Sequence, residues 1–150
     1  RLELEITERL LIERPDDVLA TLMRLKERGA SIALDDFGTG YSSLSYLLKF
    51  PFDKIKIDKS FISAIDHDKA ACDVLRTIGS LGKTLGIRIT AEGVETEEQV
   101  TFLRAIACDQ LQGYFFAKPL DSSGVATFLL GNAAQRLKTA ETNTPSSKAA

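Results

Sequence analysis

The sequence is poor in the residues that build Cys/His zinc sites: its 150 residues include two cysteines and one histidine. Cys72 and Cys108 lie far apart with no Cys-x-x-Cys pair, so a Cys/His zinc site lacks enough ligands. His67, between two aspartates at an expected helix start, is interpreted as a surface residue. Two free thiols are typical of a reducing compartment, so we expect a cytoplasmic protein, whose longer parent could be anchored to a membrane. Any catalysis must therefore use carboxylates, lysine and metal.

The chain also lacks an excess of positive charge and a long apolar run. Lys and Arg number 19 against 21 Asp and Glu, for a net charge of −2, which argues against DNA binding through phosphate neutralisation. No stretch approaches the roughly 18 apolar residues of a membrane-spanning helix. An apolar content of 44% and a charged content of 27% are those of a globular chain. Arg1 begins inside an expected strand without an initiator Met, so we expect a piece of a longer protein.

Short β-rich runs alternate with longer amphipathic stretches. The expected strands are Leu2–Thr7, Ser31–Asp36, Lys54–Asp58, Ile87–Ala91 and Leu111–Phe116. The expected helices are Pro15–Arg28, Ser42–Lys49, Asp68–Leu85, Glu97–Ala105 and Ser122–Leu130. Strand starts fall 29, 23, 33 and 24 residues apart, the spacing of repeated βα units, and each helix must return the chain before the next strand. The pattern predicts an α/β fold with a parallel sheet.

Local signals support these boundaries. Gly29 and Gly86 follow expected helix ends, and Thr96 with Gln99 has the form of a capping box. From residue 132 the composition turns polar, so we expect a domain over 1–131 and a disordered tail over 132–150. A complete βα barrel takes about 250 residues, so the units predict either an open doubly wound sheet or part of a barrel.

Polar residues lie late in the expected strands, where a buried parallel strand is normally apolar. The carboxyl ends of parallel strands meet at one rim, which is where βα proteins place their active sites. The residues concerned are Glu5, Asp35, Asp36, Lys56, Glu92 and Gln112. Each acid taken singly could instead be a helix cap or a solvated loop residue. That alternative fits the whole set poorly.

The four carboxylates of this set would repel one another at one rim, and Lys56 supplies only one positive charge. An oxygen-rich donor set without nitrogen ligands selects hard divalent cations. We therefore expect one or two Mg²⁺ or Mn²⁺ ions, held by Glu5, Asp35, Asp36 and Glu92.

The most specific string runs from Asp35 to Leu44, Asp-Asp-Phe-Gly-Thr-Gly-Tyr-Ser-Ser-Leu. It follows a strand and opens a helix, as a dinucleotide-binding Gly-rich turn does. Ser43 replaces the third glycine, however, and two aspartates stand where pyrophosphate would be repelled, so a dinucleotide site is disfavoured.

Five strings in this order resemble the EAL domain, the bacterial cyclic di-GMP phosphodiesterase family. They are Leu4-Glu5-Ile6-Thr7-Glu8, the Asp35–Leu44 string, Lys56-Ile57-Asp58-Lys59-Ser60-Phe61, Ala91-Glu92-Gly93-Val94-Glu95-Thr96 and Gln112-Gly113-Tyr114. The resemblance covers about residues 2 to 130. It implies two-metal hydrolysis of cyclic di-GMP to linear pGpG.

The resemblance also implies residue roles. Glu5, Asp35, Asp36 and Glu92 match ligands of two Mg²⁺ or Mn²⁺ ions, and Lys56 matches a lysine near the attacking water. Gln112 matches a catalytic and substrate-binding residue of the same site, while Glu95 matches a supporting acid. Glu8 matches a glutamate that steadies the loop over residues 36–44, through which the family forms homodimers.

The family fold is a modified (β/α)8 TIM-like barrel. On this resemblance the chain holds the distal five βα units, and the first three strands are absent, with the signature Glu and a metal-binding Asn. We expect the isolated piece to be marginally stable and inactive, and the intact domain to be the enzyme, with a sensory or GGDEF-type domain upstream. An inactive EAL-fold receptor or scaffold that acts by binding is the alternative.

Overall fold

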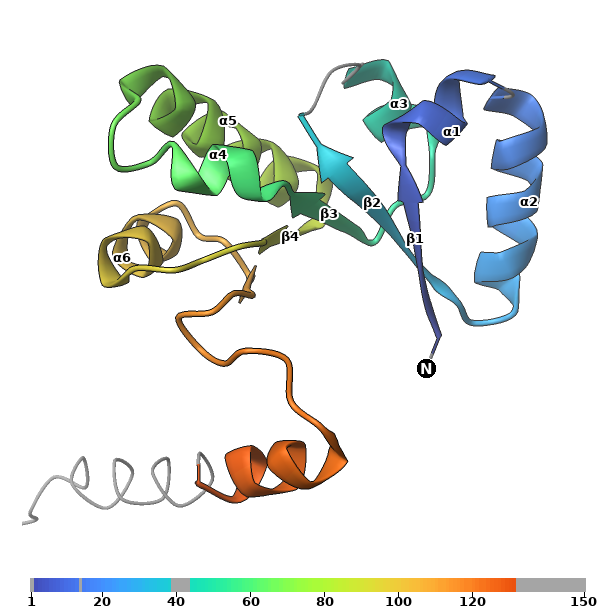
Figure 1. Ribbon diagram of the computed structural model, residues 1–150. Helices are drawn as coiled ribbons and strands as arrows, with labels where there is room; N and C mark the ends of the chain where they lie inside the picture. The colour runs from blue at the N-terminus through green and yellow to red at the C-terminus, as the bar shows by residue number, and fades with distance from the viewer. Residues whose placement is uncertain (1, 14, 39–43, 132–150) are drawn as a thin grey trace, which may run out of the picture. The chain divides into compact units, whose positions relative to one another are not determined.

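The structure, a computed structural model, describes residues 2–13, 15–38 and 44–131 (Figure 1). It divides into two units, Arg1–Phe116 and Ala117–Ala150. The second unit contains a helix over residues 122–131, close to the expected range. The predicted disordered tail, residues 132–150, lies outside the described residues. No helix in the described ranges is long and apolar enough to cross a membrane.

The first unit is built on one parallel sheet, as the strand spacing predicted. Its strands are β1 (Glu3–Thr7), β2 (Ser31–Phe37), β3 (Lys54–Ile57), β4 (Arg88–Ala91) and β5 (Gln110–Leu111). They lie side by side in sequence order, and every neighbouring pair is parallel. The register pairs Thr7 with Asp35 and Lys56 with Thr90, which brings the carboxyl ends of these strands to one rim.

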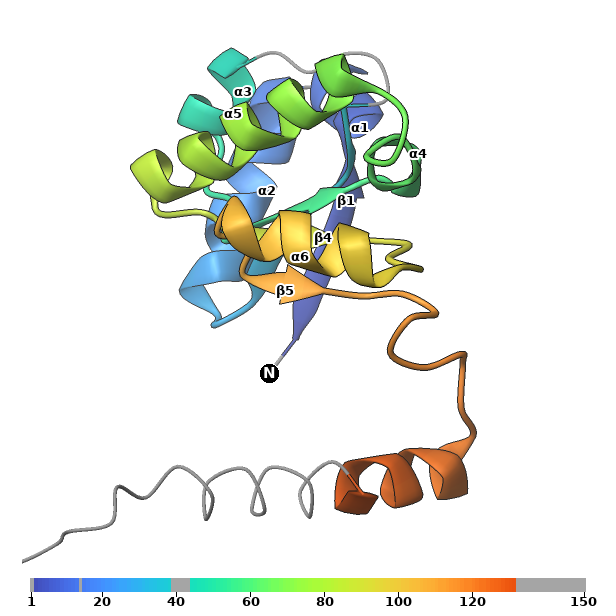
Figure 2. The same ribbon diagram turned by 90° about the vertical axis from the view of Figure 1, so that its left-hand side faces the viewer.

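Helices connect the strands and lie along the outside of the curved sheet (Figures 1 and 2). They are α1 (Glu8–Glu13), α2 (Pro15–Glu27), α3 (Leu44–Lys49), α4 (Lys59–Ser63), α5 (Lys69–Leu85) and α6 (Glu97–Ala105). Thr96 and Gln99 form the expected capping box at α6, and Gly86 ends α5 with a φ of 68°. The sequence interpretation missed α1 and α4, because one or two turns carry too little periodicity to detect.

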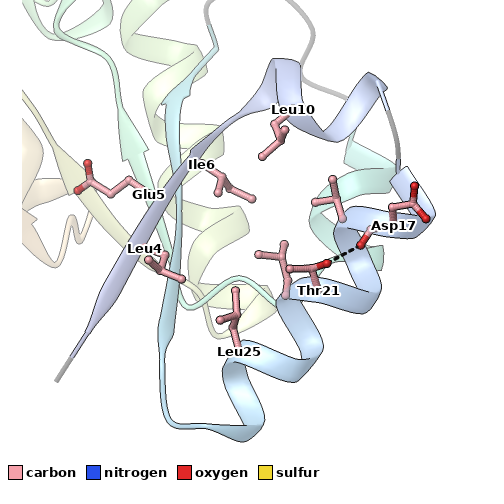
Figure 3. Close-up of a pocket in the computed structure, with 9 residues that line it drawn as sticks. Leu4, Glu5, Ile6, Leu10, Asp17, Thr21 and Leu25 are labelled. Atoms are coloured by element: carbon pink, nitrogen blue, oxygen red, sulfur yellow. Dashed lines mark hydrogen bonds between the residues drawn. The ribbon is translucent and has the colours of Figure 1, made fainter.

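Alternation along the strands separates an apolar face from a polar one. The helix-covered face carries the buried side chains of Ile32, Leu34, Ile55, Ile57 and Ile89. Figure 3 shows the same division in β1, where Leu4 and Ile6 point toward α2 and Glu5 points to the opposite face. Because side chains alternate with a period of two, the opposite face collects Glu3, Glu5, Lys54, Lys56 and Thr90.

The fifth strand is shorter than expected. The sequence predicts a strand over Leu111–Phe116, whereas β5 ends at Leu111. The chain then turns beside the loop after β4, where the Phe115 N–H donates to Val94 O at 3.0 Å. A Cβ on Gly113 would meet the Val94 carbonyl carbon at 2.7 Å, so only glycine fits this close approach. The apolar run of aromatic residues was therefore mistaken for a continuing strand.

Two aspartates fix the register at the amino ends of the strands. Asp53 precedes β3; its N–H donates to Ile32 O at 2.9 Å and its Oδ2 accepts from the Ile32 N–H at 2.8 Å. Asp109 precedes β5 and makes the same two bonds to Ile89, at 3.0 and 2.7 Å. Lys26 of α2 also donates to Asp53 at 2.7 Å. Burial alone would raise the pKa of Asp53, but Lys26 and the Ile32 N–H outweigh it and lower that pKa.

We predict that Asp53→Ala lowers the free energy of unfolding by about 1–3 kcal/mol at pH 7, because the Ile32 N–H and the Lys26 ammonium lose their acceptor. Since the folded-state pKa of Asp53 is lowered, its contribution is present above about pH 4 and is lost as the pH falls through the folded pKa. Urea unfolding of both proteins across pH 3–7 measures the difference. Glu27→Ala, at an exposed site, is the control. An equal loss of unfolding free energy in both variants would contradict the stabilising role of the Asp53 side chain.

Candidate active site

Three carboxylates surround the Lys56 ammonium of β3: one from β1, one from β2 and one from the residue directly after β4. Its Nζ lies 2.9 Å from Glu5 Oε2, 3.0 Å from Asp35 Oδ1 and 2.8 Å from Glu92 Oε1. The register produces this meeting, because Glu5 pairs with Ala33, two residues before Asp35 on the same face of β2. Glu92 likewise follows Thr90, the partner of Lys56, by two residues. Parallel pairing thus gathers residues separated by up to 87 positions of chain.

The Lys56 side chain is only 10% exposed, so its charge depends on these partners. Burial by itself would lower the Lys56 pKa, but the hydrogen bonds to Glu5, Glu92 and Asp35 outweigh it and raise that pKa well above the usual range. The ammonium therefore stays charged at neutral pH. One positive charge among three carboxylates leaves the group with an excess of two negative charges.

Asp36 adds a further acid at the same rim. Its backbone has a φ of 53°, a left-handed conformation that turns the chain sharply after β2. Burial and then the nearby charges of Asp35 and Asp58 raise the pKa of Asp36. Asp58 directly follows β3 and caps α4, its side chain accepting from the Ser60 N–H at 2.9 Å. The rim therefore concentrates negative charge beyond the three partners of Lys56.

The donor set fits a hard divalent cation. All the candidate ligands, Glu5, Asp35, Asp36 and Glu92, are carboxylates, the donors that Mg²⁺ and Mn²⁺ prefer. Asp35 Oδ1 is buried, and the Lys56 ammonium at 3.0 Å is the partner that the structure gives it. Within the described ranges no three Asp, Glu, His or Cys side chains are arranged to hold an ion as they stand. Lys56 instead lies between three of the carboxylates and is their counter-charge.

Glu8, the first residue of α1, is buried next to the start of the 36–44 loop. Its Oε1 accepts from the Gly38 N–H at 3.3 Å, and Gly38 has a φ of 100°. This contact is one that a loop-steadying residue would make. Residues 39–43 lie outside the described residues, so dimerisation through the 36–44 loop stays a prediction.

Glu95 lies on the same loop as Glu92, after β4, and Gln112 lies on the neighbouring loop, after β5. Glu95 pairs with Lys59 of α4 at 2.5 Å, and its N–H donates to Gln99 Oε1 at 2.8 Å. Gln112 follows β5; its N–H donates to Ala91 O at 2.9 Å and its carbonyl accepts from the Val94 N–H at 3.0 Å. Both residues are therefore fixed next to the Glu92 backbone, and neither is among the partners of Lys56 given above.

The sequence interpretation gave no role to Lys59 and Phe61, although both stand in the matched string after β3. Each packs on a glycine beside a candidate metal ligand, Lys59 on Gly93 and Phe61 on Gly38. The available signal was the pair of glycines that closely follow the acids in the sequence. The sequence string does not indicate that Lys59 and Phe61 would contact these two glycines.

Comparisons with known proteins bear on this arrangement. A family model described as EAL domain matches residues 1–119. "Cyclic di-GMP phosphodiesterase NbdA" of Pseudomonas aeruginosa is 43% identical over 128 residues, 85% of this chain and 16% of that protein. Among solved structures, "PaMucR Phosphodiesterase, c-di-GMP complex" aligns with a TM-score of 0.78 at 42% identity, covering 83% of this chain and 50% of the other.

A further solved structure is a manganese complex. "Klebsiella pneumoniae BlrP1 pH 9.0 manganese/cy-diGMP complex" aligns with a TM-score of 0.73 at 35% identity, covering 78% of this chain and 30% of the other. The chain spans about 16% of the length of the first curated relatives it matches. The similarity therefore concerns one part of larger proteins.

We predict that Lys56→Met destabilises the fold more at pH 7.5 than at pH 5. Without the ammonium, the three carboxylates repel one another at pH 7.5, and acidification relieves this repulsion because it reduces negative charge. We expect a loss of about 1–3 kcal/mol at pH 7.5, reduced because the carboxylates are partly exposed. Chemical unfolding at both pH values measures it.

Lys54→Met is the matched control, since Lys54 is equally buried but has one carboxylate partner among the described residues, Glu3 at 2.7 Å. Its loss should depend less on pH. A loss in Lys56→Met that is the same at both pH values would contradict the electrostatic account.

Proposed function

Because the chain belongs to the EAL domain family, we propose that it supplies part of the active site of a cyclic di-GMP phosphodiesterase. The observation that carries the proposal is the meeting of Glu5, Asp35 and Glu92 around Lys56 at one rim of a parallel sheet. The names of two relatives, cyclic di-GMP phosphodiesterase NbdA and PaMucR phosphodiesterase, support the same activity and substrate. The product would be linear pGpG.

The site would hold two divalent cations, Mg²⁺ or Mn²⁺. Support comes from the all-carboxylate donor set and the manganese in the BlrP1 complex. Glu5, Asp35, Asp36 and Glu92 would be the ligands that this chain contributes. Such ions, when bound, lower the pKa of a water and offset the charge of the phosphodiester.

The remaining residues would act around that centre. Lys56, kept charged by its carboxylate partners, would place an ammonium donor beside the attacking water or a phosphate oxygen. Gln112 would contact the substrate from the loop after β5. Glu8, through Gly38, and Glu95, through its own loop, would position the segments that carry Asp36 and Glu92.

Hydrolysis would require more of the barrel than this chain holds. The chain covers 50% of the PaMucR chain, and its polar sheet face carries charged residues that a closed (β/α)8 barrel would enclose. We propose that the 150-residue chain holds the distal five βα units and is inactive alone. For the whole protein we propose a sensory or GGDEF-type domain upstream of this chain. We also propose a homodimer formed through the 36–44 loop and a location in the cytoplasm.

We predict that Asp35→Asn in the full-length gene product lowers cyclic di-GMP turnover at saturating Mn²⁺ by 100-fold or more, because a metal ligand and its charge are lost. Chromatography of pGpG formation measures turnover. Glu3→Gln is the control, as Glu3 lies on the same sheet face but pairs with Lys54; its turnover should stay within threefold.

Wild-type turnover in Asp35→Asn would contradict the assignment of Asp35. If the unmodified full-length protein bound cyclic di-GMP without hydrolysing it, the phosphodiesterase proposal itself would be wrong.

A further inference from the structure

Two glycines with left-handed backbone conformations lie beside the candidate metal ligands. Gly38, with a φ of 100°, is two residues beyond Asp36, and Gly93, with a φ of 69°, directly follows Glu92. A side chain at either glycine would clash with α4, the five-residue helix that begins directly after Asp58. One short helix therefore contacts both the segment that follows the Asp35–Asp36 pair of β2 and the loop that carries Glu92.

On one side, α4 contacts the loop after β4 through Lys59. A Cβ on Gly93 would lie 2.7 Å from Lys59 Cβ and 2.8 Å from Lys59 Cδ, so the aliphatic part of Lys59 covers the glycine backbone. The Lys59 ammonium reaches onward to Glu95 in the same loop. The lysine thus spans the loop from Gly93 to Glu95, with Glu92 immediately before it.

On the other side, α4 contacts the loop after β2 through Phe61. A Cβ on Gly38 would lie 2.6 Å from Phe61 Cε2, so the aromatic ring packs directly on the Gly38 backbone. The Gly38 N–H is held at the same time by Glu8. The segment after Asp36 is therefore held between α1 and α4.

The helix itself has a fixed origin. It follows β3, the strand that carries Lys56; its N-terminus is capped by Asp58, and Ile62 is completely buried. Packing and capping hold α4 firmly relative to Lys56, so its contacts can transmit that position to both loops.

We propose that Lys59 and Phe61 are positioning residues that set the separation of the Asp35–Asp36 pair from Glu92, with α4 as the brace between them. The proposal rests on the proposed function, since those acids are its metal ligands. A metal site needs its ligands within a fraction of an ångström, so small loop displacements weaken it. The brace acts through geometry, because neither side chain is itself a candidate ligand.

If Lys59 only stabilised the fold, its replacement would change the melting temperature and not the metal affinity specifically. Lys59 is 58% exposed, and an exposed ion pair contributes little to the free energy of unfolding. Lys59→Ala should therefore leave the melting temperature within about 2 °C of the wild type, while it loosens the loop beside Glu92. The test must report on the loops and on metal binding as well as on stability.

The experiment compares Lys59→Ala and Phe61→Leu with two controls in the full-length gene product. Lys69→Ala changes an exposed lysine at the start of α5, and Phe102→Leu changes a half-buried phenylalanine of α6 under Arg76. Amide hydrogen exchange gives the state of the loops, and calorimetric titration with Mn²⁺ gives the metal affinity.

In Lys59→Ala we expect at least fivefold faster exchange at the Glu92 and Val94 amides, which donate to Ile57 O and Gln112 O. In Phe61→Leu the same increase is expected at the Gly38 amide, with the β4 loop unchanged. Both variants should raise the Mn²⁺ dissociation constant at least threefold. Lys59→Arg, which keeps an aliphatic stem and the positive charge, should have the wild-type dissociation constant. The controls should match the wild type.

Unchanged exchange at these amides would overturn the brace, as would faster exchange spread over the whole sheet, which is the mark of general destabilisation. Local exchange with unaltered Mn²⁺ affinity would equally overturn it. If the wild type bound no Mn²⁺ and hydrolysed no cyclic di-GMP, the proposed function would fail, and the exchange measurements would still decide whether α4 holds the two loops.

Discussion

The candidate site depends on the ion pairs of the Lys56 ammonium with three carboxylates. Three carboxylates could not share one rim without a cation, and Lys56 reaches all three within 3.0 Å. Its position follows from the register of β3 between β2 and β4, because a slip of one residue would turn the ammonium toward the helices. The charge balance and the strand pairing are thus two aspects of one constraint.

The sequence predicted the parts of the fold that repeat or that carry strong local signals. The parallel sheet follows from the strand spacing, and the α6 start follows from Thr96 and Gln99. The missed elements, α1 and α4, are too short to show a helical period. The expected strand over residues 111–116 was wrong because Gly113 packs against Val94, a contact between distant segments that local patterns do not contain.

The candidate site was predictable in its composition but not in its internal pairing. Acids late in successive parallel strands must reach one rim, so the grouping of Glu5, Asp35 and Glu92 with Lys56 could be expected from the pattern. That Glu95 pairs with Lys59, and that Phe61 covers Gly38, depends on how α4 lies between two loops. Such contacts are set by tertiary packing, for which residue spacing along the chain gives no measure.

The two polar layers of the sheet show why the chemistry belongs to one end of it. Toward the amino ends, Lys54 pairs with Glu3 at 2.7 Å. Two residues further along β3, Lys56 faces three carboxylates, and Asp36 lies nearby with a raised pKa. The first layer has no excess of negative charge, because Arg88 of β4 pairs in register with Lys54. The second has an excess of negative charge, which a divalent cation would offset, and this imbalance distinguishes a binding site from a buried structural ion pair on the same face.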